Sequence, residues 1–423
     1  MSILTTLFVG IDVSKQSNYI RALDFNQNQF LNFKALNNEV GATFIKDKVI
    51  PILNQNKFDS VVFIIESTGV YSYHIATFLS TNDELLKYNS IVYCVNPKVV
   101  KKYIESYNDS DKTDPDDALA LADFGRVGRC KNLSPWRGPQ LLALQRLTRF
   151  RIHLTEQVTR EKNYVLNNIF LKFSSFSTDE DDFPFSNKFG ATSRAVLTDF
   201  MSTEEIINSS LEDLTSFIIS KGKGRFSNPS KTAELLQKTA RDSYRLDKVA
   251  YLPINIAIAS SLNCIKTFEN EIKDISKAIE LNVKGINPQG YEILKSIPGI
   301  GPIFASGILS EIGSIEQFDN DEGLAKYAGI TWRKHQSGKF DSEDTYMTKT
   351  GNAYLRYYIM EATASVVRNI PEYNDFFNRK FKEAKTHQYK RALALTSRKL
   401  IRLIYGLLRK NQLYSKKITI KLN

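Results

Sequence analysis

The stretch Leu-Phe-Val-Gly-Ile-Asp-Val at residues 7–13 is an apolar, partly β-branched run with one carboxylate inside it. Similar runs follow at 60–65 (Ser-Val-Val-Phe-Ile-Ile) and 91–95 (Ile-Val-Tyr-Cys-Val), and short continuous runs of this kind are typical of buried central strands. More polar runs at about 18–24 and 29–34 predict further strands on one side of the same sheet. Helix-length segments lie between the runs, so the first 110 residues are predicted to form a mixed α/β domain.

Two of these predicted strands carry a carboxylate. Asp12 lies inside the first run, in Gly-Ile-Asp-Val-Ser-Lys, and Glu66 follows directly after the run at 60–65. An ionised carboxylate in a buried strand is costly unless it is paired with another group or binds a cation. Both residues are therefore candidates for a cation site.

A third acidic feature opens a predicted helix that runs from Pro115 to Arg126. Asp114 and Asp117 lie three residues apart at its start, so they share one face of the helix. Taken alone, such a pair is more typical of a helix cap and a partner of the helix dipole than of metal ligands. Together with two strand-end carboxylates, it meets the needs of a two-metal phosphoryl-transfer site, in which oxygen ligands hold Mg²⁺ or Mn²⁺ ions about 3.5–4 Å apart.

The composition favours a folded protein with a polyanionic partner. The chain has 423 residues, 42% of them hydrophobic, and a formal net charge of +11. Its length predicts two or three domains, and its charge favours nucleic acid or an anionic membrane surface. We find no apolar run of about 18 residues and no secretory signal pattern, which favours nucleic acid and a cytoplasmic location. The three cysteines are far apart and odd in number, and this predicts free thiols.

The positive charge is concentrated at the C-terminal end. Residues 379–423 hold fourteen Lys or Arg and one acid, Glu383, so this segment has a formal charge of +13. A solvated helix face is the ordinary explanation of a charge run, but an excess with almost no compensating acid favours contact with phosphates. Arg398, Lys399 and Arg402 are candidate phosphate contacts within it.

Two stretches with apolar residues at spacings of three and four predict long helices. The first seam contains Leu144, Leu147, Leu154, Val158, Val165 and Ile169, and the second contains Ile258, Leu262, Ile265, Ile272 and Ile279. Such coiled-coil-like seams pair either with each other, as an antiparallel hairpin in one chain, or between chains as an oligomerisation stalk. The sequence leaves both arrangements open. Small helices are expected between them, at 173–232.

Residues 296–302, Ser-Ile-Pro-Gly-Ile-Gly-Pro, lie between two predicted short helices, the second of which ends at Ile312. An apolar-Pro-Gly-apolar-Gly turn is typical of a helix-hairpin-helix, in which Gly299 and Gly301 would let backbone N–H groups approach a phosphate. A plain turn between two helices has the same pattern, so both interpretations remain open.

These motifs together resemble a known family. Gly-Ile-Asp-Val-Ser-Lys, Glu-Ser-Thr-Gly-Val-Tyr, Asn96-Pro97 and Lys-Thr-Asp followed by Asp-Ala are similar to the DEDD transposases of the insertion-sequence 110 family, relatives of the Piv invertases. The C-terminal half resembles the transposase domain of that family in Ile-Pro-Gly-Ile-Gly, Tyr-Ala-Gly-Ile-Thr, Gln-Ser-Gly and Lys-Thr-Gly-Asn followed by Leu-Arg. The match covers about residues 7–130 and 285–410.

The resemblance implies an RNase H-like (RuvC-like) α/β fold for the first domain. It also implies that Asp12, Glu66, Asp114 and Asp117 are the catalytic acids that bind the metal ions. Asp116 is an additional acid in the same segment, but the spacing of three residues in the family selects Asp117.

The resemblance further implies a serine nucleophile, which falls on Ser337 in Gln-Ser-Gly. Basic residues on both sides would hold a phosphate close to it. From the local sequence alone, a serine in such a loop is more often a phosphate hydrogen-bond donor, and Gln336 stands where relatives can have an acid. Ser342 is the less favoured substitute. The candidate phosphate contacts near this motif and after it are Arg333, Lys334, Lys339, Lys349 and Arg356.

The sequence thus predicts an insertion-sequence transposase, a site-specific recombinase that cuts and rejoins DNA with a metal-bound acidic tetrad and a serine in one composite site. The family implies a homo-oligomer, a dimer or a tetramer, guided by a structured non-coding RNA, and no membrane partner. Two alternatives stay open. One is a hydrolytic RNase H-like nuclease of the junction-resolvase type, in which Ser337 only binds phosphate, and the other is a non-enzymatic architectural DNA binder.

Three domains are predicted along the chain. They are an RNase H-like catalytic domain at 1–130, a helical coiled-coil-like region with an insertion at 138–285, and a mostly α-helical transposase domain at 286–423, which carries the helix-hairpin-helix, the serine and the basic tail.

Overall fold

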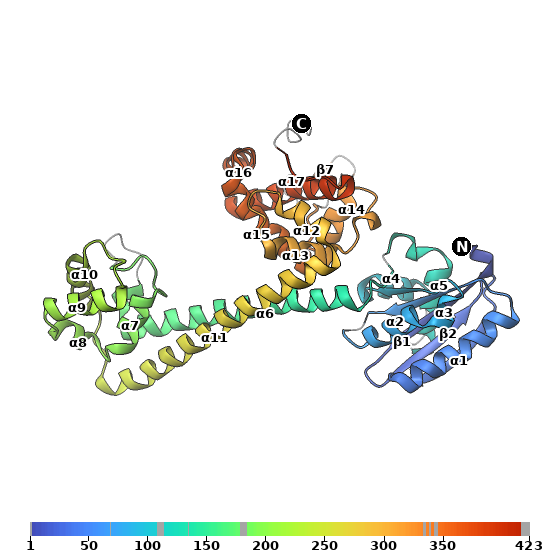
Figure 1. The fold of residues 1–423 in the computed structure, drawn as a ribbon, viewed down its shortest axis with the longest axis horizontal. Coiled ribbons are helices and arrows are strands. Elements are labelled where there is room, and N and C mark those ends of the chain that lie inside the picture. Colours follow the sequence, from blue (N-terminus) through green and yellow to red (C-terminus); the bar gives the residue numbers. More distant parts are fainter. Residues whose placement is uncertain are drawn as a thin grey trace. The chain divides into compact units, whose positions relative to one another are not determined.

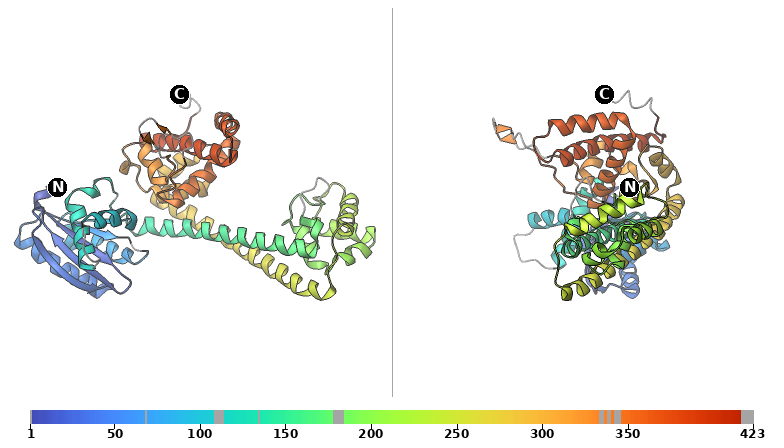
Figure 2. Two further views of the ribbon diagram at one scale, coloured as in Figure 1. Left: turned by 180° about the vertical axis from the view of Figure 1, so that it is seen from behind. Right: turned by 90° about the vertical axis from the view of Figure 1, so that its left-hand side faces the viewer.

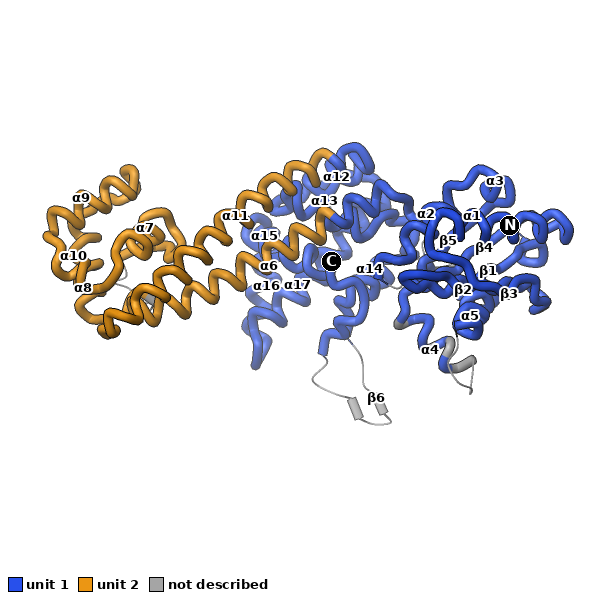
Figure 3. Tube along the Cα trace, turned by 90° about the horizontal axis from the view of Figure 1, so that it is seen from below, with its two compact units in different colours: residues 1–146, 282–423 blue, residues 147–281 orange. Residues whose placement is uncertain are grey.

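A computed structural model of the chain describes residues 2–67, 69–107, 114–133, 135–177, 184–332, 336–337, 340–341 and 346–415. The chain splits into two compact units. Figure 1 and Figure 2 show its helices and strands, coloured along the sequence. The first unit combines residues 1–146 with 282–423, and the second is formed by residues 147–281 (Figure 3). The predicted three-domain division remains a prediction.

A five-stranded sheet lies in the N-terminal part of the first unit, with the strand order β3-β2-β1-β4-β5. Its strands are β1 (Thr6–Val13), β2 (Ser17–Leu23), β3 (Gln29–Leu36), β4 (Ser60–Glu66) and β5 (Ile91–Val95). β2 pairs antiparallel with β1 and β3, whereas β4 pairs parallel with β1 and β5. The predicted strands and the predicted mixed sheet are confirmed.

Helices cover both faces of this sheet. The elements are η1 (Ile3–Thr5), α1 (Glu39–Gln55), α2 (Ser72–Thr81), α3 (Asp83–Leu86), α4 (Pro97–Tyr107), α5 (Asp114–Arg126) and η2 (Arg129–Asn132). Val9 and Ile11 of β1 pack in a core cluster with residues of α1 and α2, whereas Phe8 packs in another cluster with residues of α4 and α5. Alternate residues of β1 thus point to opposite covered faces, which explains its continuous apolar run.

The C-terminal part of the first unit is mostly helical. Its elements are α12 (Pro288–Lys295), α13 (Pro302–Ile312), η4 (Ile315–Gln317), α14 (Asp321–Ala328), β6 (Gln336–Ser337), β7 (Phe340–Asp341), α15 (Ala353–Asn369), α16 (Pro371–Glu383) and α17 (Gln388–Lys410). Helix α17 contacts both α12 and α15, and Tyr291, Tyr358 and Leu400 from these three helices are completely buried. α12 and α13 flank the predicted turn, whereas a helix-hairpin-helix function there remains a prediction.

The second unit contains most of two long helices, α6 (Pro139–Lys172) and α11 (Lys248–Ile286). Val165 and Ile169 of α6 share a core cluster with Ile258 and Ile265 of α11, so the two predicted seams meet within one chain. The antiparallel hairpin is therefore the arrangement seen here. By length and composition alone, α11 includes a window that would suit a membrane span, with a mean hydropathy of 1.2, but core helices pass the same test.

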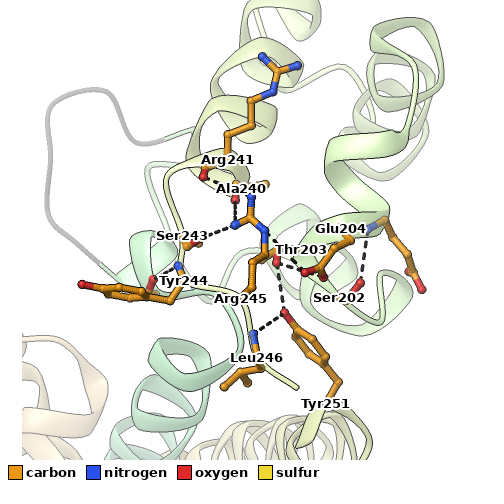
Figure 4. Close-up of polar contacts among 12 residues, drawn as sticks. Ser202, Thr203, Glu204, Ala240, Arg241, Ser243, Tyr244, Arg245, Leu246 and Tyr251 are labelled. Carbon is orange, nitrogen blue, oxygen red and sulfur yellow. Dashed lines mark hydrogen bonds and ion pairs between the residues drawn. The ribbon is translucent and has the colours of Figure 1, made fainter. Parts of the chain in front are cut away.

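Short helices form a cap on this hairpin, as expected from the sequence. They are η3 (Ser174–Ser177), α7 (Ala191–Asp199), α8 (Thr203–Asn208), α9 (Leu211–Gly222) and α10 (Pro229–Arg241). Figure 4 shows the polar contacts that join α10 to α8 and α11. The Arg245 guanidinium donates to the Ala240 carbonyl oxygen at 3.1 Å and lies 3.6 Å from the Glu204 carboxylate. The Tyr251 hydroxyl of α11 lies 3.2 Å from the Thr203 hydroxyl.

Candidate active site

Two of the predicted acids leave neighbouring strands at the same end of the sheet. β1 and β4 run parallel with Ile11 opposite Ile65, and Asp12 and Glu66 are the next residues on the two strands. Paired strands lie about 4.8 Å apart, so these carboxylates start from adjacent positions on one face. Both side chains are half-buried.

Gly10 brings helix α5 directly onto this face. A Cβ atom at Gly10 would lie 2.0 Å from the carbonyl oxygen of Ala118 and 2.4 Å from the backbone nitrogen of Ala122. A side chain of any size is therefore excluded where the backbone of α5 crosses β1. Because residues alternate along a strand, Asp12 points to the same face as Gly10, which is the face that α5 covers.

The direction of α5 places its first turn at the end of β1 that carries Asp12. Ala118 lies over Gly10. Gly125 is at the other end of the helix, where an added Cβ atom would lie 3.4 Å from the ring of Phe8. The helix therefore runs opposite to β1, and its acidic first turn extends beyond Gly10 toward Asp12. In that turn Asp117 is buried, with 6% of its surface exposed, and Asp114 is exposed.

The four candidate acids offer only carboxylate oxygens as donor atoms, and these are the ligands that hard divalent cations prefer. Among the residues that the structure describes, no group of three or more His, Cys, Asp or Glu side chains lies close enough together to hold a metal ion. Asp12, Glu66, Asp116 and Asp117 each already have an interaction partner. The acids would have to exchange those partners and draw closer together to share an ion.

Another buried acid of α5, Asp123, belongs to a different arrangement. It is 3% exposed, and its carboxylate accepts hydrogen bonds from the Tyr103 hydroxyl and from Arg126 Nε, the latter at 2.6 Å. Arg126 also donates to the carbonyl oxygen of Phe25 at 3.2 Å. With a phenol and a guanidinium bound to it, Asp123 ties α5 to α4 and is not a candidate metal ligand.

The predicted nucleophile lies in a small β-hairpin of the C-terminal part. Ser337 of β6 pairs with Phe340 of β7, and Gln336 pairs with Asp341. At the base of the hairpin, the backbone N–H of Thr348 donates to the carbonyl oxygen of Thr331 at 2.8 Å. Arg333, Lys334, His335, Lys339 and Ser342 lie outside the described residues, and so does the side chain of Ser337.

Two glycine-containing segments, one around Gly329 and one around Gly351, pack against each other near the base of this hairpin. A Cβ atom at Gly351 would lie 2.4 Å from the carbonyl oxygen of Tyr327, and one at Gly329 would lie 2.6 Å from the carbonyl oxygen of Thr350. Both glycines have positive φ angles, 131° and 69°. The Tyr-Ala-Gly-Ile and Lys-Thr-Gly-Asn motifs therefore pack backbone against backbone.

Several predicted phosphate contacts have structural partners. Gly299 approaches helix α15, because a Cβ there would lie 2.8 Å from Cα of Val366, whereas Gly301 caps α13 and faces open space. Arg356 donates to the carbonyl oxygen of Ala328 at 3.0 Å, and burial lowers the pKa of its guanidinium. Lys349 is exposed.

The basic residues of α17 are partly engaged in ion pairs. Arg398 Nη1 lies 2.6 Å from the Asp321 carboxylate, and Arg402 Nε lies 3.7 Å from the same oxygen. Lys399 pairs with Glu372 at 2.5 Å. Acids from outside residues 379–423 thus neutralise part of the charge that the sequence count assigned to that segment. Phosphate contact by these residues remains a prediction.

Two family models of transposases match this chain. The DEDD model of the IS110 elements, described as a transposase, matches residues 9–172, which include all four candidate acids. A second model, described as the transposase IS116/IS110/IS902 family, matches residues 291–378, which include the serine hairpin.

Curated relatives match nearly the whole chain. An uncharacterized 44.8 kDa protein of insertion element IS116 from Streptomyces clavuligerus is 23% identical over 417 residues, 97% of this chain and 96% of that protein. A pilin gene-inverting protein from Moraxella lacunata is 22% identical and covers 98% of this chain and 99% of its own length. A solved structure of T. thermophilus RuvC with a Holliday junction substrate is 13% identical and covers 31% of this chain and 99% of its own, with a TM-score of 0.24.

Proposed function

This chain belongs to the insertion-sequence 110 family of transposases, and we propose that it cuts and rejoins DNA with Asp12, Glu66, Asp114, Asp117 and Ser337 acting together. The observation that carries the proposal is the contact between Gly10 and Ala118, which sets the acidic first turn of α5 on the end of the sheet where Asp12 and Glu66 emerge. Acids from three separate segments lie toward one end of the sheet, and they would draw together around metal ions as a phosphoryl-transfer site requires.

The four acids would hold Mg²⁺ or Mn²⁺. When bound, the ions would polarise the scissile phosphate and stabilise the attacking and leaving oxygens. The contribution of the chain itself is to fix the carboxylates on two strands and one helix, and Gly10 allows that helix to lie close to β1. Rigid elements position ligands more accurately than loops do.

Ser337 would attack the phosphorus atom of the scissile phosphodiester. Its Oγ forms a new O–P bond while the bond from phosphorus to the leaving deoxyribose oxygen breaks. The hydroxyl proton leaves the serine, and the leaving oxygen takes up a proton, so a phosphodiester is exchanged for a phosphodiester. The reversal of this step rejoins DNA without an external energy source. A serine hydroxyl needs activation and orientation for this step, which the acidic site would supply.

The remaining parts of the proposal concern partners. We propose that the protein works in the cytoplasm as a homo-oligomer, a dimer or tetramer, in which acids and serine form a composite site. A structured non-coding RNA would select the DNA by base pairing, and the protein would contact mostly backbone and shape. The net charge of +11 is compatible with binding both nucleic acids.

Denaturing electrophoresis tests the serine step. The substrate is labelled DNA that flanks the gene, incubated with RNA transcribed from the same segment and with Mg²⁺. The wild-type protein is expected to form a covalent DNA adduct, whose attachment point peptide mapping assigns to Ser337. Ser337→Ala should bind DNA yet form no adduct, Ser342→Ala should form it normally, and Asp12→Ala should abolish cleavage.

The competing function is a hydrolytic RNase H-like nuclease, in which Ser337 only binds phosphate. It predicts free DNA ends and no adduct with the wild-type protein. An adduct that survives in Ser337→Ala would also contradict the nucleophile assignment. An architectural binder, in contrast, predicts no cleavage by any variant and no effect of Asp12→Ala.

A further inference from the structure

Helix α13 carries a carboxylate in the apolar interior of the helical domain. Glu311 has none of its surface exposed, and neither do Ile308 and Ile312 beside it. An ionised carboxylate that loses its water costs several kcal/mol unless hydrogen bonds replace the water. A protein with a well-packed apolar side chain at such a position is often as stable or more stable. Stability alone therefore does not explain the presence of Glu311.

Glu311 is bound to the residue that caps helix α15. Its Oε2 accepts a hydrogen bond from Asn352 Nδ2 at 2.7 Å and a longer one from Gln145 Nε2 at 3.4 Å. The other end of the Asn352 amide accepts from the backbone N–H groups of Tyr354 and Leu355, each at 3.0 Å. The amide of Asn352 is thus fixed on one side by α13 and on the other side by α15.

Asn352 ends the short segment that closes the serine hairpin. Its backbone N–H donates to the carbonyl oxygen of Tyr327 at 2.7 Å, and Gly351 packs against that same oxygen. Four residues earlier, Thr348 is joined to Thr331 by a backbone hydrogen bond and by a hydroxyl contact of 3.1 Å. Gly351 already lies against the Tyr327 carbonyl oxygen, so Asn352 and Gly351 have no room to move toward it. A displacement of Asn352 would therefore also displace Thr348, at the base of the hairpin.

The backbone of Glu311 is bound by Arg137, which lies just before α6. Arg137 donates to the Glu311 carbonyl oxygen at 3.3 Å and to Gln317 Oε1 at 2.8 Å. Trp136, the residue before Arg137, donates its backbone N–H to the carbonyl oxygen of Val92 in β5 at 2.7 Å. Two consecutive residues therefore bind the sheet that carries the acids and the helix that carries Glu311.

We propose that Glu311 is a positioning residue for the serine hairpin, which it holds through Asn352. This inference rests on the proposed role of Ser337. Strands of two residues cannot fix their own orientation, so the hairpin depends on its base. A nucleophile displaced by about 1 Å can lose on the order of a hundredfold in rate.

A pair of substitutions tests this link. Asn352→Asp places a carboxylate against the Glu311 carboxylate, whereas Glu311→Gln keeps a side-chain carbonyl oxygen that can still accept from Asn352 Nδ2. Asn352→Asp is expected to slow single-turnover adduct formation at saturating DNA about 10–100-fold, with the DNA dissociation constant unchanged, whereas Glu311→Gln alone should stay within about threefold of the wild-type rate. The double variant restores one donor and one acceptor with their direction reversed, and Asp caps a helix as well as Asn does. It should recover to within about threefold of the wild-type rate.

Thr363→Val is the matched control. Thr363 is completely buried in the same domain and accepts a hydrogen bond from Ser397 Oγ at 3.0 Å, away from the hairpin. It should lower the melting temperature without changing the adduct rate of the folded protein. Hydrogen exchange at residues 331–348 should accelerate in Asn352→Asp and not in this control.

Two results would overturn the inference. One is a wild-type adduct rate with unchanged hairpin exchange in Asn352→Asp, and the other is a double variant that stays as slow as Asn352→Asp. Failure of the proposed function looks different, because the wild-type protein itself would then form no adduct at Ser337. In that case hydrogen exchange still decides whether Glu311 holds the hairpin.

Discussion

At Gly10 the absence of a side chain decides how closely α5 approaches β1. We expect Gly10→Ala to lower the free energy of unfolding by about 1–3 kcal/mol or more, because its Cβ would overlap the backbone of Ala118. DNA cleavage should fall as well, since α5 carries two of the acids. Chemical denaturation and a cleavage assay measure the two effects.

The control for Gly10 is Gly285→Ala. Gly285 lies in α11 with nothing within 4 Å of a built Cβ, so alanine there should stabilise the helix by about 0.5–1 kcal/mol. Wild-type stability and activity in Gly10→Ala would show that α5 does not depend on this contact.

Lys172 at the end of α6 makes the second unit sensitive to pH. Its side chain is 2% exposed, and Nζ donates to the carbonyl oxygens of Leu197 at 2.8 Å and Phe200 at 2.6 Å. Burial lowers its pKa from 10.5 to about 8, although Glu205 opposes the shift. Between these values the unfolded chain binds the proton more tightly than the folded one, so stability rises as pH rises from about 8 to 10.5.

We expect this rise to be on the order of 1–3 kcal/mol in the wild-type protein. Lys172→Met should remove it, even if the lost hydrogen bonds lower stability at every pH. Urea denaturation at pH 7.5, 9 and 10.5 measures the difference, and the exposed Lys231→Met is the control. Parallel pH profiles of wild type and Lys172→Met would contradict the prediction.

At the scale of elements, continuous apolar runs were sufficient to predict β1, β4 and β5, because strands covered on both faces need no polar residues. Asp114 and Asp117, three residues apart on either side of Pro115, predicted the start of α5 and its acidic first turn. Other contacts left no pattern in the sequence. Glu311 is one acid in an apolar helix, and its partners Asn352 and Gln145 are far away along the chain. Arg356 fits a phosphate contact by residue type, yet it binds a backbone carbonyl oxygen.

Helix α17 limits how the basic tail can be tested. Leu400, Ile401 and Ile404 are completely buried, so truncation at Arg379 would remove part of the domain core. Truncation after Ser415 removes only Lys416, Lys417 and Lys421 from the formal charge. If these residues contact phosphates, the slope of log affinity against log salt should become shallower by up to about 2.7. Titrations at several salt concentrations measure it, and an unchanged slope would assign phosphate binding elsewhere.

At the scale of the whole molecule, the acids and the serine lie in parts of the chain that are far apart in sequence and belong to one unit. Trp136 and Arg137 are the junction between these parts, since one contacts β5 and the other contacts α13. The second unit, which includes most of α6 and α11, is inserted between these two parts along the chain and contributes none of the candidate catalytic residues.

The pairing of α6 with α11 makes a prediction about assembly. Because both seams are buried against each other in one chain, Ile265→Lys would place a charge where no surface is exposed, and it should destabilise the second unit by several kcal/mol. The mass measured by light scattering should stay that of the wild-type protein under conditions in which the unit remains folded. Cys264→Lys, at the exposed neighbouring position, is the control and should change neither property. If instead Ile265→Lys lowered the mass while the melting temperature stayed unchanged, the seam would belong to a stalk between chains. An unchanged mass together with lower stability would place any contacts between chains outside this seam.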